Sequence, residues 1–306
     1  MNPCYLAIEI GGTKLQIVAG SAAGTVVERR RLNVDRDRGG SGIRVQIEQT
    51  LPGLMSSVRP AAIGVGFGGP VEWKTGRIRC SHQIEGWSDF GLAEWLHSLT
   101  HVPVRVDNDA NVAALGEASN GAGTGSNPVF YVTLGSGVGG GLVVDGAIYH
   151  GMTPGEAEIG HVRLDRRGDT IESRCSGWAV DRKIRNGCAS RPDSALARLS
   201  QDSTGAEARH LAAALGMGDA LAEQILAETA EDLAFGLSHA VHLFHPERIV
   251  LGGGLSLIGE PLRLAVEQSL PAHVMTAFAP GPSIRLAALG EDAVPVGALA
   301  LAAQAL

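Results

Sequence analysis

The chain has 306 residues, of which 44% are hydrophobic. This is enough apolar material for about two globular domains of roughly 150 residues each, so disorder is excluded as the dominant state. The net charge of −7, without a long basic stretch, argues against a nucleic-acid partner. No apolar run reaches the roughly 18 residues of a membrane span, and no secretory signal is visible at the start. We therefore expect a cytoplasmic protein with no membrane partner.

The first elements in chain order are three β-prone runs, at Tyr5–Ile10, Lys14–Gly20 and Thr25–Leu32. Short turns that contain glycine join them, which predicts an antiparallel meander at the edge of a sheet. Apolar residues then recur at helical spacing over Ile43–Val58, despite Pro52, and predict a helix. The apolar run at 61–67 predicts a buried strand.

Helices and strands alternate in the next part of the chain. An amphipathic helix is expected over Phe90–Leu99 and a strand over Val102–Asp107, and Asn108 or Asp109 is suited to cap the helix that follows. Residues Val129–Gly151 then repeat the opening order of strand, glycine turn, strand, turn and strand. The two halves of the chain are therefore expected to share one order of strands and turns.

The remaining elements complete an α/β pattern. Helices are expected through most of Cys175–Phe244, a strand followed by a glycine turn over Arg248–Leu255, and a strand at Ser283–Leu289. Val294–Leu306 predicts a last helix with Pro295 in its first turn.

Glycine-rich turns follow three of the apolar strands, at Gly11–Lys14, Gly135–Gly141 and Gly252–Gly254. Glycine lets consecutive backbone N–H groups converge on phosphate oxygens. One such turn is equally typical of a hairpin that needs positive φ, but three in one chain favour a nucleotide site. None fits the Walker pattern, and the G-x-G-x-x-G match at Gly135–Gly140 leads into a strand, which disfavours a dinucleotide fold.

Two polar constellations are candidates for binding a hydroxyl-rich ligand. Asn108, Asp109 and Asn111 lie at a strand-to-helix junction, where a helix cap alone would also explain one of them. The stretch Gly155–His161, followed by Glu172, supplies carboxylates and an imidazole. A solvated acidic loop and a histidine packed in the core are the alternative interpretations of this second group.

These motifs occur in an order that resembles the ROK sugar kinases (repressors, open reading frames and kinases) of the actin-like superfamily. The matching strings are IEIGGTK, GVGFGGPV, VPVRVDNDANVAALGE, LGSGVGGGLVVDG, AEIGHV and PERIVLGGG. The resemblance covers nearly the whole chain and implies two RNase H-like α/β lobes with a cleft between them. It places the smaller lobe at 1–116, completed by the last helix at 293–306, and the larger lobe at 117–292. It also implies a homodimer.

The resemblance further implies roles for individual residues. The first phosphate loop would be Gly11, Gly12, Thr13 and Lys14, the second Gly135, Ser136, Gly137 and Gly139, and the adenosine would lie by Gly253 and Gly254. The sugar-binding positions would be Gly69, Asn108, Asp109, Glu158, His161 and Glu172, with Asp109 as the catalytic base. ATP and Mg²⁺ would be the cofactors.

Two departures from the family pattern bear on metals. Members usually carry a zinc-binding cysteine cluster between the histidine and the last glutamate, whereas the interval after His161 reads VRLDRRGDTI, without cysteine. No zinc is therefore expected. Glu9 stands where the family usually has an aspartate that positions Mg²⁺ through water, and its extra methylene moves the carboxylate by about 1.5 Å.

The resulting hypothesis is ATP-dependent phosphorylation of a hexose hydroxyl, the 6-hydroxyl of glucose or a related hexose, with Asp109 as general base. A sugar-responsive transcription regulator would need a helix-turn-helix of roughly 60 to 80 residues, and the first strand begins at about Tyr5. A catalytically impaired sugar-binding or regulatory ROK protein without a DNA-binding domain is the alternative. The choice among glucose, an N-acetylated hexosamine and fructose stays open, as does polyphosphate in place of ATP.

Overall fold

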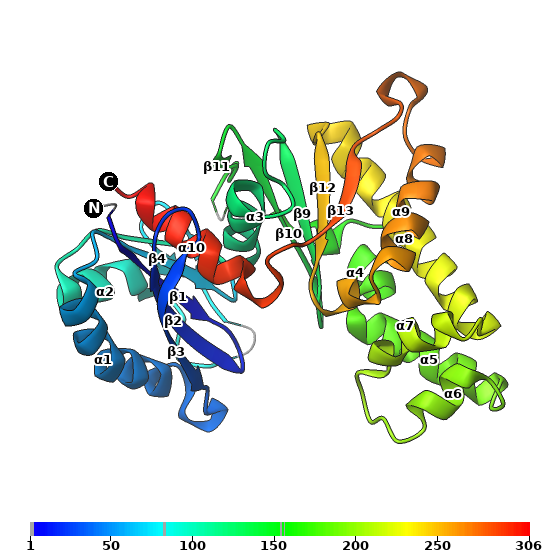
Figure 1. The fold of residues 1–306 in the computed structure, drawn as a ribbon, viewed down its shortest axis with the longest axis horizontal. Helices are drawn as coiled ribbons and strands as arrows, with labels where there is room; N and C mark the ends of the chain where they lie inside the picture. The colour runs from blue at the N-terminus through cyan, green and yellow to red at the C-terminus, as the bar shows by residue number, and fades with distance from the viewer. Residues whose placement is uncertain (1–2, 82–83, 154, 156) are drawn as a thin grey trace. The chain divides into compact units, whose positions relative to one another are not determined.

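The computed structural model describes residues 3–81, 84–153, 155 and 157–306 (Figure 1). The chain divides into two compact units, which are described here one at a time. The first consists of Met1–Gly125, Gly141–Ala157 and Ala288–Leu306, and the second of Ser126–Gly140 and Glu158–Ala287.

The strands are β1 (Tyr5–Ile10), β2 (Lys14–Gly20), β3 (Val26–Asn33), β4 (Ile63–Phe67), β5 (Val71–Glu72), β6 (Arg77–Ile78), β7 (Phe90–Gly91), β8 (Val104–Asn108), β9 (Val129–Leu134), β10 (Val138–Val144), β11 (Ala147–Ile148), β12 (Arg248–Gly252) and β13 (Ser283–Leu286). The α-helices are α1 (Gly39–Val58), α2 (Leu92–Thr100), α3 (Asp109–Asn120), α4 (Ile171–Cys175), α5 (Gly177–Ser190), α6 (Ala195–Ser200), α7 (Leu211–Gly216), α8 (Ala220–Phe244), α9 (Glu260–Ser269) and α10 (Ala293–Ala303). The predicted α/β class is confirmed. No helix among the described residues has both the length and the apolar character that crossing a membrane requires.

The first sheet has the strand order β3-β2-β1-β4-β8. The predicted antiparallel meander is confirmed, because β1 pairs with β2 and β2 with β3, both antiparallel. The meander does not lie wholly at the edge of the sheet, however, because β1 also pairs in parallel with β4 and so becomes the central strand. This position suits its sequence, in which every side chain except Glu9 is fully buried.

Helix α10 belongs to the first unit and packs against α3, β1 and β4. It is apolar around its whole circumference, which is typical of a helix that is covered on all sides. A Cβ atom at Gly297 would overlap the carbonyl oxygen of Val112 in α3. The absence of a side chain at Gly297 therefore permits the close approach of the two helices.

The second sheet has the order β11-β10-β9-β12-β13. Strand β12 pairs in parallel with β9 and β13, just as β4 pairs in parallel with β1 and β8 in the first sheet. The chain passes from the second unit to the first within β10, after Gly140. The repeated order of strands and turns predicted from the sequence thus corresponds to two sheets of one topology.

A small third sheet, in the order β5-β6-β7, was not expected from the sequence. Its strands are two residues long, which is too short for an alternating pattern to be recognised. One consequence is that Phe90–Gly91 forms β7, so that the expected helix begins only at Leu92.

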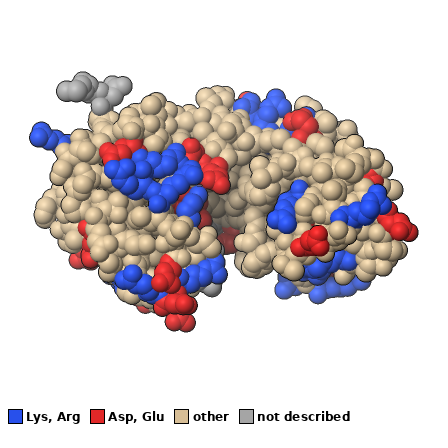
Figure 2. Space-filling view, turned by 60° about the horizontal axis from the view of Figure 1, so that its bottom comes forward, with Lys and Arg blue, Asp and Glu red and all other residues tan. Residues whose placement is uncertain are grey.

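The arginines of β3 lie beside carboxylates on the surface of the first unit. Arg29 contacts Asp292 at 2.6 Å, and Arg30 contacts Glu28 at 2.5 Å. Figure 2 shows clusters of Lys and Arg next to Asp and Glu on the face drawn. The arginines of β3 therefore do not make an uncompensated basic surface.

Candidate active site

The carboxyl ends of β1, β4 and β8 bring three of the predicted motifs together in the first unit. The N–H of Gly68 donates to the carbonyl oxygen of Ile10 at 2.9 Å, and Asn108 Nδ2 donates to the carbonyl oxygen of Gly69 at 3.3 Å. A Cβ at Gly68 would lie 3.4 Å from Asp109 Oδ2. Parallel strands end at one edge of a sheet, so the predicted sugar-binding residues Gly69, Asn108 and Asp109 lie side by side.

Asn108, and not Asp109, caps helix α3. Its Oδ1 accepts hydrogen bonds from the N–H groups of Ala110 at 2.9 Å and Asn111 at 3.3 Å, as an N-cap side chain does. Asp109 is the first residue of the helix, and its Oδ1 accepts from the N–H of Ala110 at 2.8 Å. The cap therefore does not explain the carboxylate of Asp109, whose Oδ2 is directed toward the backbone of Gly68.

The first glycine turn joins β1 to β2 and has charged neighbours. The N–H of Gly11 donates to the carbonyl oxygen of Lys14 at 3.0 Å, which closes the turn. Glu9 is 15% exposed, with Oε1 3.4 Å from Lys14 Nζ, and its Oε2 accepts from Gln16 Nε2 at 2.8 Å. Backbone N–H groups, an ammonium and a carboxylate therefore meet at this turn.

The second glycine turn lies in the second unit and is held by residues from helices α4 and α5. The N–H of Gly177 donates to the carbonyl oxygen of Gly135 at 2.7 Å, and Glu172 Oε2 accepts from the N–H of Val138 at 2.9 Å. A Cβ at Gly137 would lie 2.5 Å from the same carboxylate oxygen. A side chain at Gly137 would therefore displace the carboxylate of Glu172.

Most of these glycines do not have the positive φ that the hairpin interpretation requires. Gly11, Gly135, Gly137 and Gly254 do not have positive φ, whereas Gly253 has φ +80°. Gly253 is also crowded, because a Cβ there would lie 2.6 Å from backbone atoms of Leu134. This contact places the third glycine turn against the end of β9, beside the second turn.

The acidic stretch is exposed where the structure describes it. Glu158 precedes a 3₁₀ turn at Ile159–His161, and His161 Nε2 lies 3.8 Å from Glu158 Oε2. The His161 side chain is 73% exposed, so the alternative of a histidine packed in the core is wrong. Glu156 of the same stretch lies outside the described residues.

A hydrogen-bonded hairpin closes the short interval between His161 and Glu172. Asp165 Oδ1 accepts from the N–H groups of Arg167, Gly168 and Asp169 at 2.8, 2.9 and 3.1 Å, and Arg163 pairs with Thr170 as a β-bridge. Desolvation would raise the pKa of Asp165, but these three donors together with Arg167 hold that pKa below its usual value. Within the described part of the chain, no group of three or more His, Cys, Asp or Glu side chains could hold a metal ion.

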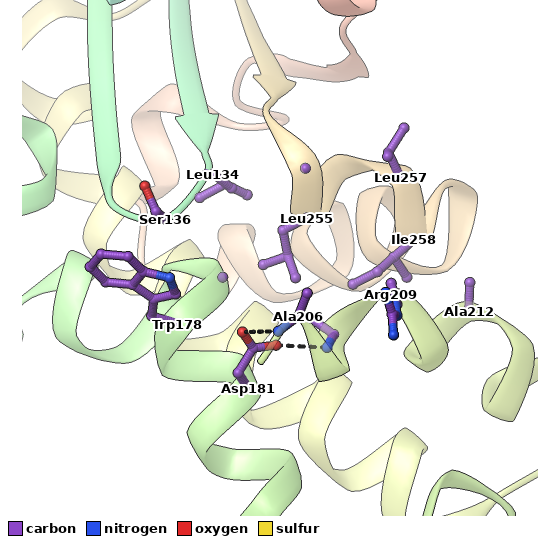
Figure 3. Close-up of a pocket in the computed structure, with 14 residues that line it drawn as sticks. Leu134, Ser136, Trp178, Asp181, Ala206, Arg209, Ala212, Leu255, Leu257 and Ile258 are labelled. Carbon is purple, nitrogen blue, oxygen red and sulfur yellow. Dashed lines mark hydrogen bonds between the residues drawn. The ribbon is translucent and has the colours of Figure 1, made fainter. Parts of the chain in front are cut away.

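A pocket of about 420 Å³ adjoins the second and third glycine turns in the second unit (Figure 3). Its lining includes Leu134, Ser136, Trp178, Asp181, Arg209, Leu255 and Ile258. Asp181 is buried and accepts from the N–H groups of Ala206 at 3.1 Å and Ala208 at 2.7 Å, so it fixes the loop that forms one wall. A mostly apolar pocket beside two glycine turns suits a ligand with a flat ring and an anionic tail.

Sequence reasoning found the glycine turns of this pocket but missed Trp178, Asp181 and Arg209. The only local signal was at Trp178, which directly follows the Ser176 and Gly177 of the family pattern. The other two come from separate helical segments that carry no motif.

Comparisons with known proteins agree with this arrangement. Residues 5–305 match the sequence model of the ROK family. The chain belongs to the ROK family. This ROK protein is 34% identical to a glucokinase of Halalkalibacterium halodurans, over 96% of this chain and 93% of that protein. It is 28% identical to a glucokinase of Thermotoga maritima, over 97% of this chain and 96% of that protein.

Solved structures of ROK proteins share the fold. A ROK family glucokinase from Streptomyces griseus in complex with glucose and AMPPNP superposes with a TM-score of 0.83 at 29% identity, over 98% of this chain and 99% of that chain. A ROK hexokinase from Thermus thermophilus gives a TM-score of 0.81 at 27% identity, with 98% of each chain covered. The predicted family and the predicted fold class are thereby confirmed.

Proposed function

We propose that this ROK protein transfers the γ-phosphoryl group of ATP to a hydroxyl of a hexose, the 6-hydroxyl of glucose or a related sugar. The comparisons confirm the coarser prediction of a sugar kinase, because proteins similar over nearly the whole chain are glucokinases. The observation that carries the finer proposal is the position of Asp109. Its carboxylate lies at the joined ends of β4 and β8, beside Gly68 and Gly69, and capping of α3 does not account for it.

Asp109 would act as general base. It would accept the proton of the sugar hydroxyl as that oxygen attacks the γ-phosphorus in line. The transition state of phosphoryl transfer is loose, so positioning and charge neutralisation supply most of the acceleration. Asn108 would hold a neighbouring hydroxyl, and the family pattern adds Glu158, His161 and Glu172 as further hydroxyl-binding residues.

The nucleotide would bind in the pocket of the second unit. Its apolar walls suit the adenine ring, and Gly135–Gly137 and Gly253–Gly254 lie where backbone N–H groups can receive the phosphate chain. The turn Gly11–Lys14 keeps the role of first phosphate loop that the family pattern implies. A polyphosphate donor would need the glycine turns but not the apolar pocket, and the presence of this pocket favours ATP.

The residues present fit a water-mediated Mg²⁺ ion. Mg²⁺ keeps several waters in kinase sites and takes one or two carboxylates together with substrate phosphates. Glu9 offers one carboxylate beside the first glycine turn, and its bonds to Lys14 and Gln16 hold it while leaving lone pairs for water. When bound, Mg²⁺ would neutralise developing charge on the phosphates.

A coupled assay of ADP release across a panel of hexoses tests the proposal. We expect Asp109→Asn to lower the turnover number by about 10² to 10⁴-fold, the usual effect of losing a general base. Asp193→Asn, at an exposed position of the second unit, serves as the matched control and should keep the wild-type rate. A near-native rate of Asp109→Asn would refute the assignment of the base.

The alternative of an impaired sugar-binding protein gives a different result. Such a protein would be stabilised against heat by a hexose but would release no ADP with any sugar of the panel. The homodimer implied by the resemblance and the cytoplasmic location expected from the sequence stay predictions.

A further inference from the structure

A buried carboxylate next to the proposed base is not used by the mechanism above. Asp107, in β8, is 3% exposed. Its Oδ1 accepts from the N–H of Asn108 at 2.8 Å and from Asn111 Nδ2 at 3.0 Å. These bonds tie the end of β8 to the first turn of α3, on either side of Asp109.

The other oxygen of Asp107 has a single strong partner from a distant part of the sequence. Asp107 Oδ2 lies 2.5 Å from His150 Nε2, and both residues belong to the first unit. An ionised carboxylate can only accept, so Nε2 carries the shared hydrogen. A buried carboxylate rarely occurs without such a partner.

The ring of His150 is held in a fixed orientation. It stacks on the indole of Trp73, with ring centroids 4.1 Å apart and planes inclined by 11°. Gly155 lies close to His150, because a Cβ at Gly155 would lie 2.6 Å from the Cβ of His150. The carbonyl oxygen of Gly155 also accepts from Asn111 Nδ2 at 2.9 Å. The imidazole therefore reaches Asp107 in one geometry.

An open space adjoins this pair. A cavity of about 460 Å³ is lined by Trp73, Asp107 and His150, together with Lys74, Arg105 and Gln304, and neither Asn108 nor Asp109 is part of its lining. Water can therefore reach Asp107 if the imidazole is removed.

We propose that His150 is a positioning residue for phosphoryl transfer, which holds Asp107 and thereby fixes the turn that carries Asn108 and Asp109. The inference rests on the proposed function. Without its partner, the Asp107 carboxylate is either left buried and unpaired or rotates toward the water of the cavity. Rotation breaks its bonds to Asn108 and Asn111, and the base beside them loses its fixed position.

Steady-state kinetics of hexose phosphorylation by the full-length protein test this role. We expect His150→Phe, which keeps an aromatic ring on Trp73 but loses the donor, to lower the turnover number by about 10 to 100-fold and to raise the KM for the sugar. The KM for ATP should change by less than about threefold, because the nucleotide pocket belongs to the second unit. A general loss of folded protein would not raise the KM for the sugar while leaving the KM for ATP nearly unchanged.

Three further measurements serve as controls. His150→Gln keeps an N–H near the position of Nε2 and should stay within about fivefold of the wild-type turnover number. His97→Phe removes another ring of the first unit, whose Nδ1 contacts only the carbonyl oxygen of Val102, and should leave the kinetic constants unchanged. His150→Ala should regain activity when imidazole is added, because the cavity gives the small molecule access to Asp107.

The inference would be overturned if folded His150→Phe had the kinetic constants of the wild type. It would also be overturned if the turnover number fell equally in His150→Phe and His150→Gln. If His150→Phe does not fold, the activity of His150→Ala with added imidazole is the test. The proposal is overturned if imidazole restores no activity to His150→Ala. The two proposals fail separately. A wild-type protein that releases no ADP with any hexose removes the proposed function, whereas an active wild-type kinase together with a fully active His150→Phe removes only the role of His150.

Discussion

The first and second sheets share one strand order, but the helix that follows the last strand of each has a different task. Helix α3 follows β8 and presents Asn108 and Asp109 at its beginning, where the strands of the first sheet end. Helix α10 follows β13 and is apolar all round, with Asp292 at its N-cap position making no side-chain cap bond. The helix after the first sheet thus begins with the proposed sugar-binding residues, and the helix after the second sheet packs within the first unit.

The glycine turns of the two sheets differ in a similar way. The turn between β1 and β2 has Glu9 and Lys14 within its own hairpin. The turn between β9 and β10 has no charged residue of its own and receives the carboxylate of Glu172 from α4. The two glycine turns therefore occupy the same position in the two sheets, but the charged side chain beside each turn comes from a different kind of element.

The largest effect on stability should come from the packing of α10. Gly297→Ala places a Cβ against the backbone of α3 and should lower the free energy of unfolding by about 3 kcal/mol, the upper part of the range for overpacking. Gly53→Ala is the matched control, because no atom lies within 4 Å of a Cβ there, and it should raise stability by up to about 1 kcal/mol. Urea unfolding measures both. Equal effects of the two variants would contradict the packing role of Gly297.

The turn that receives its charge from outside can be tested at Glu172. Glu172→Ala removes the acceptor of the Val138 N–H, a charged hydrogen bond of about 1.5 to 3 kcal/mol, and should raise the KM for ATP by about 10 to 100-fold. Glu172→Gln keeps an oxygen acceptor and should lose less. Initial rates at varied ATP provide the measurement. A change confined to the KM for the sugar would show that Glu172 does not support the turn.

The turn with its own charges can be tested at Glu9. Glu9→Gln removes the carboxylate charge and should raise the Mg²⁺ concentration for half-maximal rate by about tenfold, as for other residues that act on a metal through water. Glu48→Gln, on the exposed face of α1, should leave that concentration unchanged. The rate measured at increasing MgCl₂ concentrations gives the Mg²⁺ concentration for half-maximal rate in each variant. An unaltered requirement in Glu9→Gln would remove Glu9 from the site.

The smallest effect concerns the start of α10 and depends on pH. The hydrogen bond from Arg29, and then its charge, lower the pKa of Asp292 despite desolvation. The pair should therefore stabilise the fold above the unfolded pKa of about 3.9 and lose this contribution as the pH falls through the lower folded value. The Tm of Asp292→Asn should lie below that of the wild type at pH 7, and the difference should shrink as the pH falls below the unfolded pKa of about 3.9. A constant difference would contradict the pairing.

The sequence was most informative where structure depends on neighbours a few residues apart. The meander β1–β3 and the helix across Pro52 follow from alternation and helical spacing, and both were predicted. Side-chain type limited the cap of α3 to Asn108 or Asp109, and the structure places it at Asn108. The glycine turns were recognised as well. The alternative of hairpin turns with positive φ holds at Gly253 but not at Gly137, where the neighbouring side chain is that of Glu172 from a later helix.

The sequence by itself was enough to recognise the family, the α/β class and the polar residues at the start of α3, because these features depend on local patterns and on the order of motifs. Only the tertiary structure decided that β1 is the central strand, that Trp178 and Arg209 line one pocket, and that His150 meets Asp107 across 43 residues. Contacts of this kind depend on which strands pair and how closely helices pack, and no short stretch of sequence contains that information.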